Sequence, residues 1–157
     1  MENRYLFRGK RIDNGEWVQG NLIRSNDAED GYEAIIIPTN DSNMFTKGGS
    51  RGDLGFENWH RVNETTICQC TGLKDKNGKL IWKNDIVKCI DKNNDIEFMA
   101  VVEFGNPNGF YNWGYQLKHI KGDKPNLDIL LWIDMEEAGA TCEVIGNVFD
   151  NPELLEE

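Results

Sequence analysis

Short apolar runs that alternate with tight-turn signals are the feature of this sequence that most constrains its fold. Asn-Gly pairs stand at Asn14-Gly15 and Asn77-Gly78, and a third reversal reads Lys83-Asn84-Asp85. Asn and Gly adopt the positive φ angles that hairpin turns require. Turns at a spacing of about ten residues are typical of a small barrel or sandwich, not of helices that cross a parallel sheet. The sequence therefore predicts an all-β, or mainly β, protein.

The apolar runs between the turns give the expected strands. They are residues 5–8, 16–23, 32–37, 86–90, 96–104, 115–120 and 142–149. The run 127–133 fits either a strand or a short helix, because a brief apolar stretch suits both. Residues 39–57 are rich in Asn, Asp, Ser and Gly, and we expect them to form a long loop. Asn151 before Pro152 predicts a capped short helix near the C-terminus.

The length of 157 residues suits one ordinary domain or two small ones that share a core. We expect an N-terminal β region over residues 1–64, which contains the loop at 39–57, and a C-terminal β region over residues 65–157. The side chains of Trp82, Ile86 and Val87 flank a tight reversal, and we expect them in the core of the C-terminal region.

The charge pattern bears on partners and location. The formal net charge is −10, and after Lys124 the sequence has nine acidic residues and no basic one. This argues against nonspecific binding to nucleic acid, because phosphates attract cationic faces. The start of the chain does not read as a signal peptide, and no apolar run approaches the ~20 residues of a membrane helix. We expect a cytoplasmic protein without membrane contact, whose cysteines are reduced.

Three segments, spread over nearly the whole chain, together resemble one family. They are Thr71–Val87, which reads T-G-L-K-D-K-N-G-K-L-I-W-K-N-D-I-V, then Glu143–Leu155, and Phe7–Arg11 followed by Glu16-Trp17-Val18. The chain resembles the YopX family of uncharacterised phage and prophage proteins. One departure is Asn84, where a glycine is usual, and Asn tolerates the same left-handed backbone.

The resemblance implies an all-β fold whose C-terminal part is an SH3-like barrel, with an N-terminal β-hairpin region packed on it and a short C-terminal helix. It also implies a place in the cytoplasm of a host bacterial cell. The family brings no established activity, and its motifs read as fold motifs made of turn glycines and buried aliphatic residues.

The cysteines raise the question of a metal site. Cys68 and Cys70 point the same way along one strand and could bind a metal with Cys89 or Cys142. Structural zinc usually shows two close pairs with two to four residues between the members, and this chain has one pair of a different spacing. We therefore interpret the cysteines as buried thiols and expect no metal and no cofactor.

The remaining polar groups do not form a catalytic pattern. His60 and His119 lack a neighbouring motif of nucleophile and base. The loop that opens at Asp91 lacks the glycine and the glutamate of a calcium loop at its sixth and twelfth positions, which are Ile96 and Val102. The sequence thus favours a protein that is not an enzyme.

Two groups of residues are candidates for an interaction surface: the aromatic residues Phe110, Tyr111 and Trp113, with Tyr115 beside them, and the acidic residues Glu136 and Glu137. The aromatic residues could equally fill a barrel core and line its rim, and the acidic run could merely keep the protein solvated.

We favour a non-enzymatic accessory protein that binds an unidentified phage or host protein. The alternatives are a nucleic-acid-associated module that uses the aromatic residues and, third, a metal-dependent hydrolase that uses acidic residues. The sequence leaves a homo-oligomer open.

Overall fold

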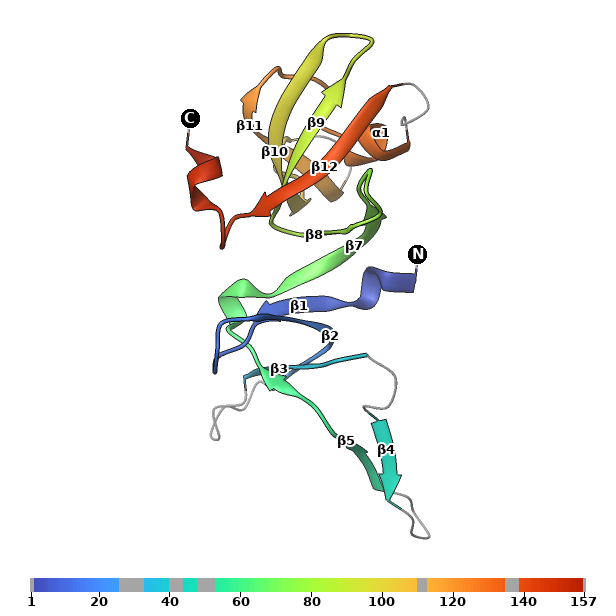
Figure 1. Cartoon of the computed structure of the whole chain (residues 1–157), viewed down its shortest axis with the longest axis vertical. Coiled ribbons are helices and arrows are strands. Elements are labelled where there is room, and N and C mark those ends of the chain that lie inside the picture. Colours follow the sequence, from blue (N-terminus) through green and yellow to red (C-terminus); the bar gives the residue numbers. More distant parts are fainter. Residues whose placement is uncertain are drawn as a thin grey trace. The chain divides into compact units, whose positions relative to one another are not determined.

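The computed structural model describes residues 2–25, 33–39, 44–47, 53–109, 113–134 and 139–156. The chain forms two compact units, Tyr5–Gln69 and Cys70–Glu157, the second together with Met1–Arg4. The expected boundary after residue 64 stays a prediction. The mainly β fold is confirmed, because strands dominate the described residues and their ladders are antiparallel (Figure 1).

The first unit is built on an antiparallel sheet in the order β6-β3-β2-β1, to which the first residues of β7 are added. Its elements are β1 (Phe7–Lys10), β2 (Trp17–Arg24), β3 (Ala34–Ile37), β4 (Met44–Lys47), β5 (Asp53–Phe56), β6 (His60–Arg61) and the 3-10 helix η2 (Glu64–Thr66). Strands β1 and β2 form the hairpin predicted from the sequence, and Gly15 in its turn has a φ of 74°. One face of the sheet carries a small core of Ala34, Ile36 and Val62.

The expectation of a loop throughout residues 39–57 is wrong for the eight residues of β4 and β5. These strands form an antiparallel hairpin in which Met44 lies opposite Phe56 and Lys47 lies opposite Asp53. Each strand is only four residues long and has no clear alternation of apolar and polar residues, so periodicity did not reveal it. Backbone hydrogen bonds between antiparallel strands do not require such a pattern, so a hairpin can form without it.

The second unit contains an antiparallel sheet in the order β11-β10-β9-β12 and a hairpin of β7 and β8. Its elements are η1 (Glu2–Tyr5, which ends at the first residue of the other unit), β7 (Cys68–Lys74, which begins in the other unit), β8 (Leu80–Trp82), β9 (Asp85–Asp91), β10 (Ile96–Gly105), β11 (Gly114–Gly122), α1 (Ile129–Asp134), β12 (Ala140–Asn147) and η4 (Pro152–Leu155).

The core of this unit lies between the sheet and α1. It includes Val87, Phe98, Val102, Leu117 and Trp132. The Trp132 ring meets the Phe98 ring edge-on, with centroids 4.9 Å apart, and so packs α1 on the sheet. In the ambiguous run 127–133 the helix begins at Ile129, whereas Asp128 forms an isolated β-bridge with Gln116. That this unit is an SH3-like barrel stays a prediction.

In the segment Thr71–Val87, which resembles the family, aspartate side chains hold the turns by hydrogen bonds. The carboxylate of Asp75 is buried and accepts three backbone N–H groups, from Asn77, Lys79 and Val144 of β12, at 2.9, 2.9 and 3.0 Å. The carboxylate of Asp85 accepts the N–H of Trp82 at 2.9 Å. The segment is therefore a fold motif, because these hydrogen bonds satisfy buried backbone N–H groups.

The residues that flank the reversal at Lys83-Asn84-Asp85 are buried as expected, although only one of them belongs to the core of the second unit. Trp82, Ile86 and Val87 are all buried, and Val87 belongs to the core of the second unit. Asn84 has a φ of 68°, so asparagine does adopt the left-handed conformation for which a glycine is usual.

The short helix near the C-terminus is present as the 3-10 helix η4, with Pro152 in its first turn. The expected side-chain cap by Asn151 is wrong, because this side chain makes no capping hydrogen bond. Its Oδ1 accepts the N–H of Asn147 at 3.3 Å instead, and the Asn151 carbonyl accepts the N–H of Leu154 at 3.1 Å. The side chain of Asn151 thus bonds to the end of β12, and only its backbone carbonyl takes part in the first turn of the helix.

Candidate binding surfaces

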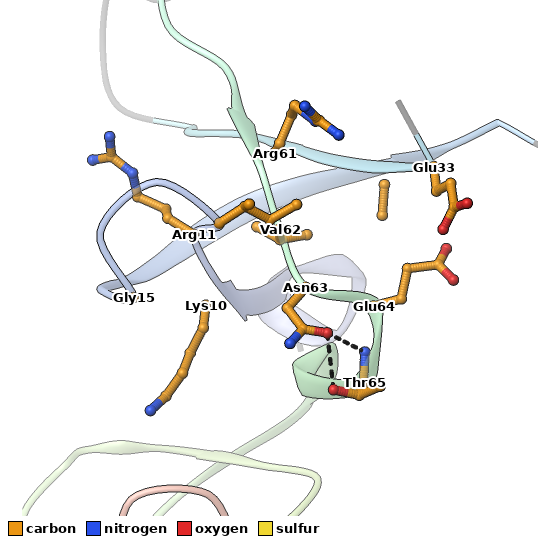
Figure 2. A pocket seen from close by; sticks show the side chains of 11 residues that line it. Lys10, Arg11, Gly15, Glu33, Arg61, Val62, Asn63, Glu64 and Thr65 are labelled. Carbon is orange, nitrogen blue, oxygen red and sulfur yellow. Dashed lines mark hydrogen bonds between the residues drawn. The ribbon is translucent and has the colours of Figure 1, made fainter. Parts of the chain in front are cut away.

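A cavity of about 740 Å³ lies in the first unit, beside the β1–β2 turn, β6 and η2. Figure 2 shows the guanidinium group of Arg11 at the left of this view, that of Arg61 near the top, and the carboxylates of Glu33 and Glu64 at the right. Both signs of charge therefore line the cavity, and it favours neither an anion nor a cation by charge alone.

Several polar groups around this cavity are held in local pairs. Arg11 donates from Nε to Asp13 at 2.9 Å, and this hydrogen bond raises the pKa of the guanidinium and lowers the pKa of the Asp13 carboxyl. Asn63 Oδ1 accepts the N–H and the hydroxyl of Thr65 at 3.0 and 2.9 Å, which caps η2. These contacts shape the wall of the cavity and stabilise the fold, and the described lining includes neither histidine nor cysteine.

A second hollow in the same unit is almost wholly apolar. This groove of about 440 Å³ is lined by Ile23, Ile35, Ile37, Phe56 and Trp59, with one serine. Ile23 and Ile35 are direct cross-strand partners on β2 and β3. The groove lies on the sheet face opposite the small core, because Ile35 and Ile37 alternate with the buried Ala34 and Ile36.

The second unit carries two exposed aromatic side chains, Phe104 and Trp113, beside the half-buried Tyr115, and we name these three residues the aromatic rim. Phe104 is 56% exposed and Trp113 is 78% exposed. Phe104 and Tyr115 are cross-strand partners at the end of the β10–β11 hairpin, and their rings meet edge-on at 5.1 Å. Gly105, with a φ of 123°, lies under Trp113, because the nearest ring atom is 3.6 Å from the place a Cβ would take.

The rim follows from the alternation of β10. Phe98, Ala100 and Val102 are buried and face the core. Phe104 is the next residue with the same orientation, but it lies at the end of the strand, where the core no longer covers it. The result is a large apolar side chain in solvent, which is more informative than an exposed small residue.

The candidate surface residues divide between described and undescribed parts of the chain. Trp113 is described and strongly exposed. Phe110, Tyr111, Glu136 and Glu137 lie outside the described residues. The role of all five stays a prediction. Phe104 is a further exposed aromatic residue, which the sequence placed only within the predicted strand 96–104. Its position as the last core-facing residue before Gly105 is the signal that could have revealed it.

The histidines and cysteines lie on strands. His119 on β11 places Nε2 3.2 Å from the carbonyl oxygen of Gly122. All four cysteines are buried thiols, and Cys89 lies directly opposite Cys142. A hydrogen bond with Cys142, together with burial, raises the pKa of the Cys89 thiol. Among the described residues, no three His, Cys, Asp or Glu side chains form a group that could hold a metal ion.

None of the helices within the described ranges is both long and apolar enough to cross a membrane.

Comparison with known proteins gives one family and one related fold. The family model described as YopX protein matches residues 6–156. No curated protein sequence matches the chain significantly. Protein EF1440 from Enterococcus faecalis, known from a crystal structure, is similar with a TM-score of 0.54 and 23% sequence identity over 96% of each chain. At that identity the likeness concerns the fold alone, whereas the family match extends over nearly the whole sequence. The chain belongs to the YopX family.

Proposed function

We propose that this YopX-family chain is a phage or prophage accessory protein that binds a phage or host protein and catalyses no reaction. The aromatic rim is its contact surface. The observation that carries the proposal is the exposure of two large aromatic side chains, 56% for Phe104 and 78% for Trp113, at the end of one hairpin. Aromatic residues are enriched at the energetic centres of protein interfaces, since they bury a large area with few rotatable bonds.

The charge of the chain indicates the chemistry of the partner. The chain carries a net charge of −10, and the sequence after Lys124 has acidic residues only. Complementary charge speeds association and weakens as salt rises. The partner surface that suits this chain is therefore cationic around an apolar centre that covers the rim.

Affinity capture from lysogenic or infected bacterial cells, followed by mass spectrometry, tests the proposal. The wild-type chain should retain a partner that the double variant Phe104→Ser/Trp113→Ala loses. The variant Trp59→Ala is the matched control, because Trp59 is also a partly exposed tryptophan (44%) but lines the apolar groove of the other unit. Circular dichroism of each variant shows whether the fold is intact.

The outcomes separate the alternatives. A partner lost with Trp59→Ala and kept by the rim variant would move the contact to the groove. Salt-sensitive binding of labelled single-stranded DNA that the rim variant abolishes would assign the rim to nucleic acid, since bases also stack on aromatic side chains. With the partner in hand, raising the salt concentration should slow association by the wild-type chain, and a rate independent of salt would contradict the role given to the acidic residues.

A further inference from the structure

Two cysteines that are far apart in the sequence face each other across the sheet of the second unit. Cys89 on β9 and Cys142 on β12 are register partners of an antiparallel ladder, and both side chains are buried. Partners in such a ladder have Cα atoms about 4.5–5.5 Å apart and point to the same face. A disulfide needs Cα atoms about 4.4–6.8 Å apart. The ladder thus places these two thiols within bridging geometry.

A cavity lies beside one of the two cysteines. It has a volume of about 200 Å³, and its lining includes Cys142, Trp132, Lys74 and Lys76 but not Cys89. The lining also includes Asp75, and Lys76 is paired with Glu143 at 2.5 Å, so both signs of charge are present on this wall. A reagent in the cavity therefore lies beside Cys142, whereas Cys89 is not part of the lining.

We propose that Cys89 and Cys142 form a disulfide when the chain meets a small-molecule disulfide such as oxidised glutathione. The Cys142 thiolate attacks one sulfur of the reagent, its S–S bond breaks, and one glutathione thiolate leaves. The Cys89 thiol then gives up its proton to the departing group as its sulfur attacks the Cys142 sulfur of this mixed disulfide, and the second glutathione leaves as a thiol. Two cysteine thiols are oxidised, one glutathione disulfide is reduced to two thiols, and the two protons go to solvent or to the leaving thiolates.

The position of β12 allows the closer approach that the bond requires. Opposed residues have Cβ atoms about 4.5–5.5 Å apart, whereas a disulfide holds them about 3.5–4.5 Å apart. Strand β12 is an outer strand of the order β11-β10-β9-β12, and its register with β9 shifts between Val144 and Gly146. A shift of this kind disrupts the ladder locally, so the strand can move slightly toward β9.

The other two cysteines give a built-in control. Cys68 and Cys70 lie two residues apart on one strand, so their Cα atoms are about 6.6 Å apart, near the far limit for a disulfide. Their side chains leave the strand in the same direction and do not converge. We therefore expect them to stay thiols under conditions that oxidise the other pair.

The test uses the full chain, incubated with mixtures of oxidised and reduced glutathione, then acid-quenched, denatured and alkylated. Mass spectrometry should show two of the four thiols lost, a mass lower by two hydrogens and a peptide that links Cys89 to Cys142. The double variant Cys68→Ser/Cys70→Ser should oxidise in the same way. Because serine at a buried position could disturb folding, peptide mapping of the wild-type chain is the primary readout.

The order of attack has its own readout. In Cys89→Ser the glutathione adduct should persist on Cys142, because no second thiol resolves it. In Cys142→Ser the adduct on Cys89 should form on the order of tenfold more slowly. A link that includes Cys68 or Cys70, or four thiols left after incubation in urea just below the unfolding transition, would overturn the proposal.

Discussion

Replacing Asp75 by alanine should strongly destabilise the second unit, although Asp75 is not part of the aromatic rim that we propose as the binding surface. Its carboxylate is 7% exposed and accepts three backbone N–H groups. The N–H of Val144 is buried, and leaving such a donor without a partner costs about 1–3 kcal/mol. The two turn bonds, to Asn77 and Lys79, are partly buried and contribute about 0.5–1.5 kcal/mol each. We therefore expect a loss of about 4 kcal/mol in the free energy of unfolding.

Asp91→Ala is the matched control for this prediction. Asp91 also accepts two turn N–H groups, from Asn93 at 2.9 Å and Asn94 at 3.2 Å, but these bonds are exposed to solvent. Water replaces the lost acceptor there, so the loss of stability should be much smaller than for Asp75→Ala. Asp75→Asn should fall between the two, since one amide oxygen can serve the turn or β12 but not both.

Equilibrium urea unfolding, followed by tryptophan fluorescence and circular dichroism, measures these differences. The slope of the transition should stay near that of the wild-type chain, so that the midpoint reports stability. If Asp75→Ala unfolded at the same urea concentration as Asp91→Ala, the buried bond to β12 would not stabilise the unit, and our account of the signature segment would be wrong.

Three further predictions address other parts of the fold. Trp82→Ala should lose about 3–5 kcal/mol in urea unfolding, because this ring is 4% exposed; an unchanged midpoint would refute its place in the interior. Gly20→Ala should lose about 2 kcal/mol or more, since a Cβ there would collide with the backbone of β3. Gly114→Ala, whose Cβ would meet open space, should stay within about 0.5 kcal/mol and is the control. The hydrogen bond from Lys76 lowers the pKa of Glu143 below its ordinary 4.5, so this pair stabilises the fold above pH 4.5, and the contribution is lost as the pH falls through the lower folded-state pKa. In Glu143→Gln the unfolding temperature should therefore fall less steeply as the pH is lowered through this range. An unchanged pH dependence would contradict the pairing.

The parts of the fold that were predictable from the sequence are those fixed by local chemistry. Gly15 and Gly78 adopt φ angles of 74° and 78°, as the Asn-Gly turns require. The run 127–133 was ambiguous because its local pattern suits a strand and a helix equally. What selects the helix includes the contact of Trp132 with Phe98, a residue of β10 that lies about thirty positions earlier in the sequence. Nonlocal packing of this kind leaves no periodic signal in a single segment.

The candidate sites also combine residues that the sequence reveals with residues that only the packing of distant segments reveals. Trp113 stands in an aromatic-rich loop and was recognisable as a surface candidate, whereas Phe104 reads as one more apolar residue of a strand. The pairing of Cys89 with Cys142 depends on the register between β9 and β12, which joins segments far apart in the sequence. From the sequence, Cys89 and Cys142 entered only as possible further ligands of a metal bound by Cys68 and Cys70, which the spacing disfavoured, because a sequence does not show which strands are neighbours.

The residues that identify the family stabilise the fold, whereas other residues are proposed to bind a partner. Experiments can separate the effects on stability from the effects on binding. Asp75 and Asp85 satisfy buried backbone groups of turns, so their replacement should reduce stability first and binding only as a consequence. Phe104 and Trp113 are exposed, and removing an exposed apolar group changes stability little. A partner lost with the rim variant at unchanged unfolding midpoint would therefore report binding itself. If Asp75→Ala also lost the partner, and bound it again at a temperature at which this variant is folded, the loss would reflect unfolding and not a direct contact of Asp75 with the partner.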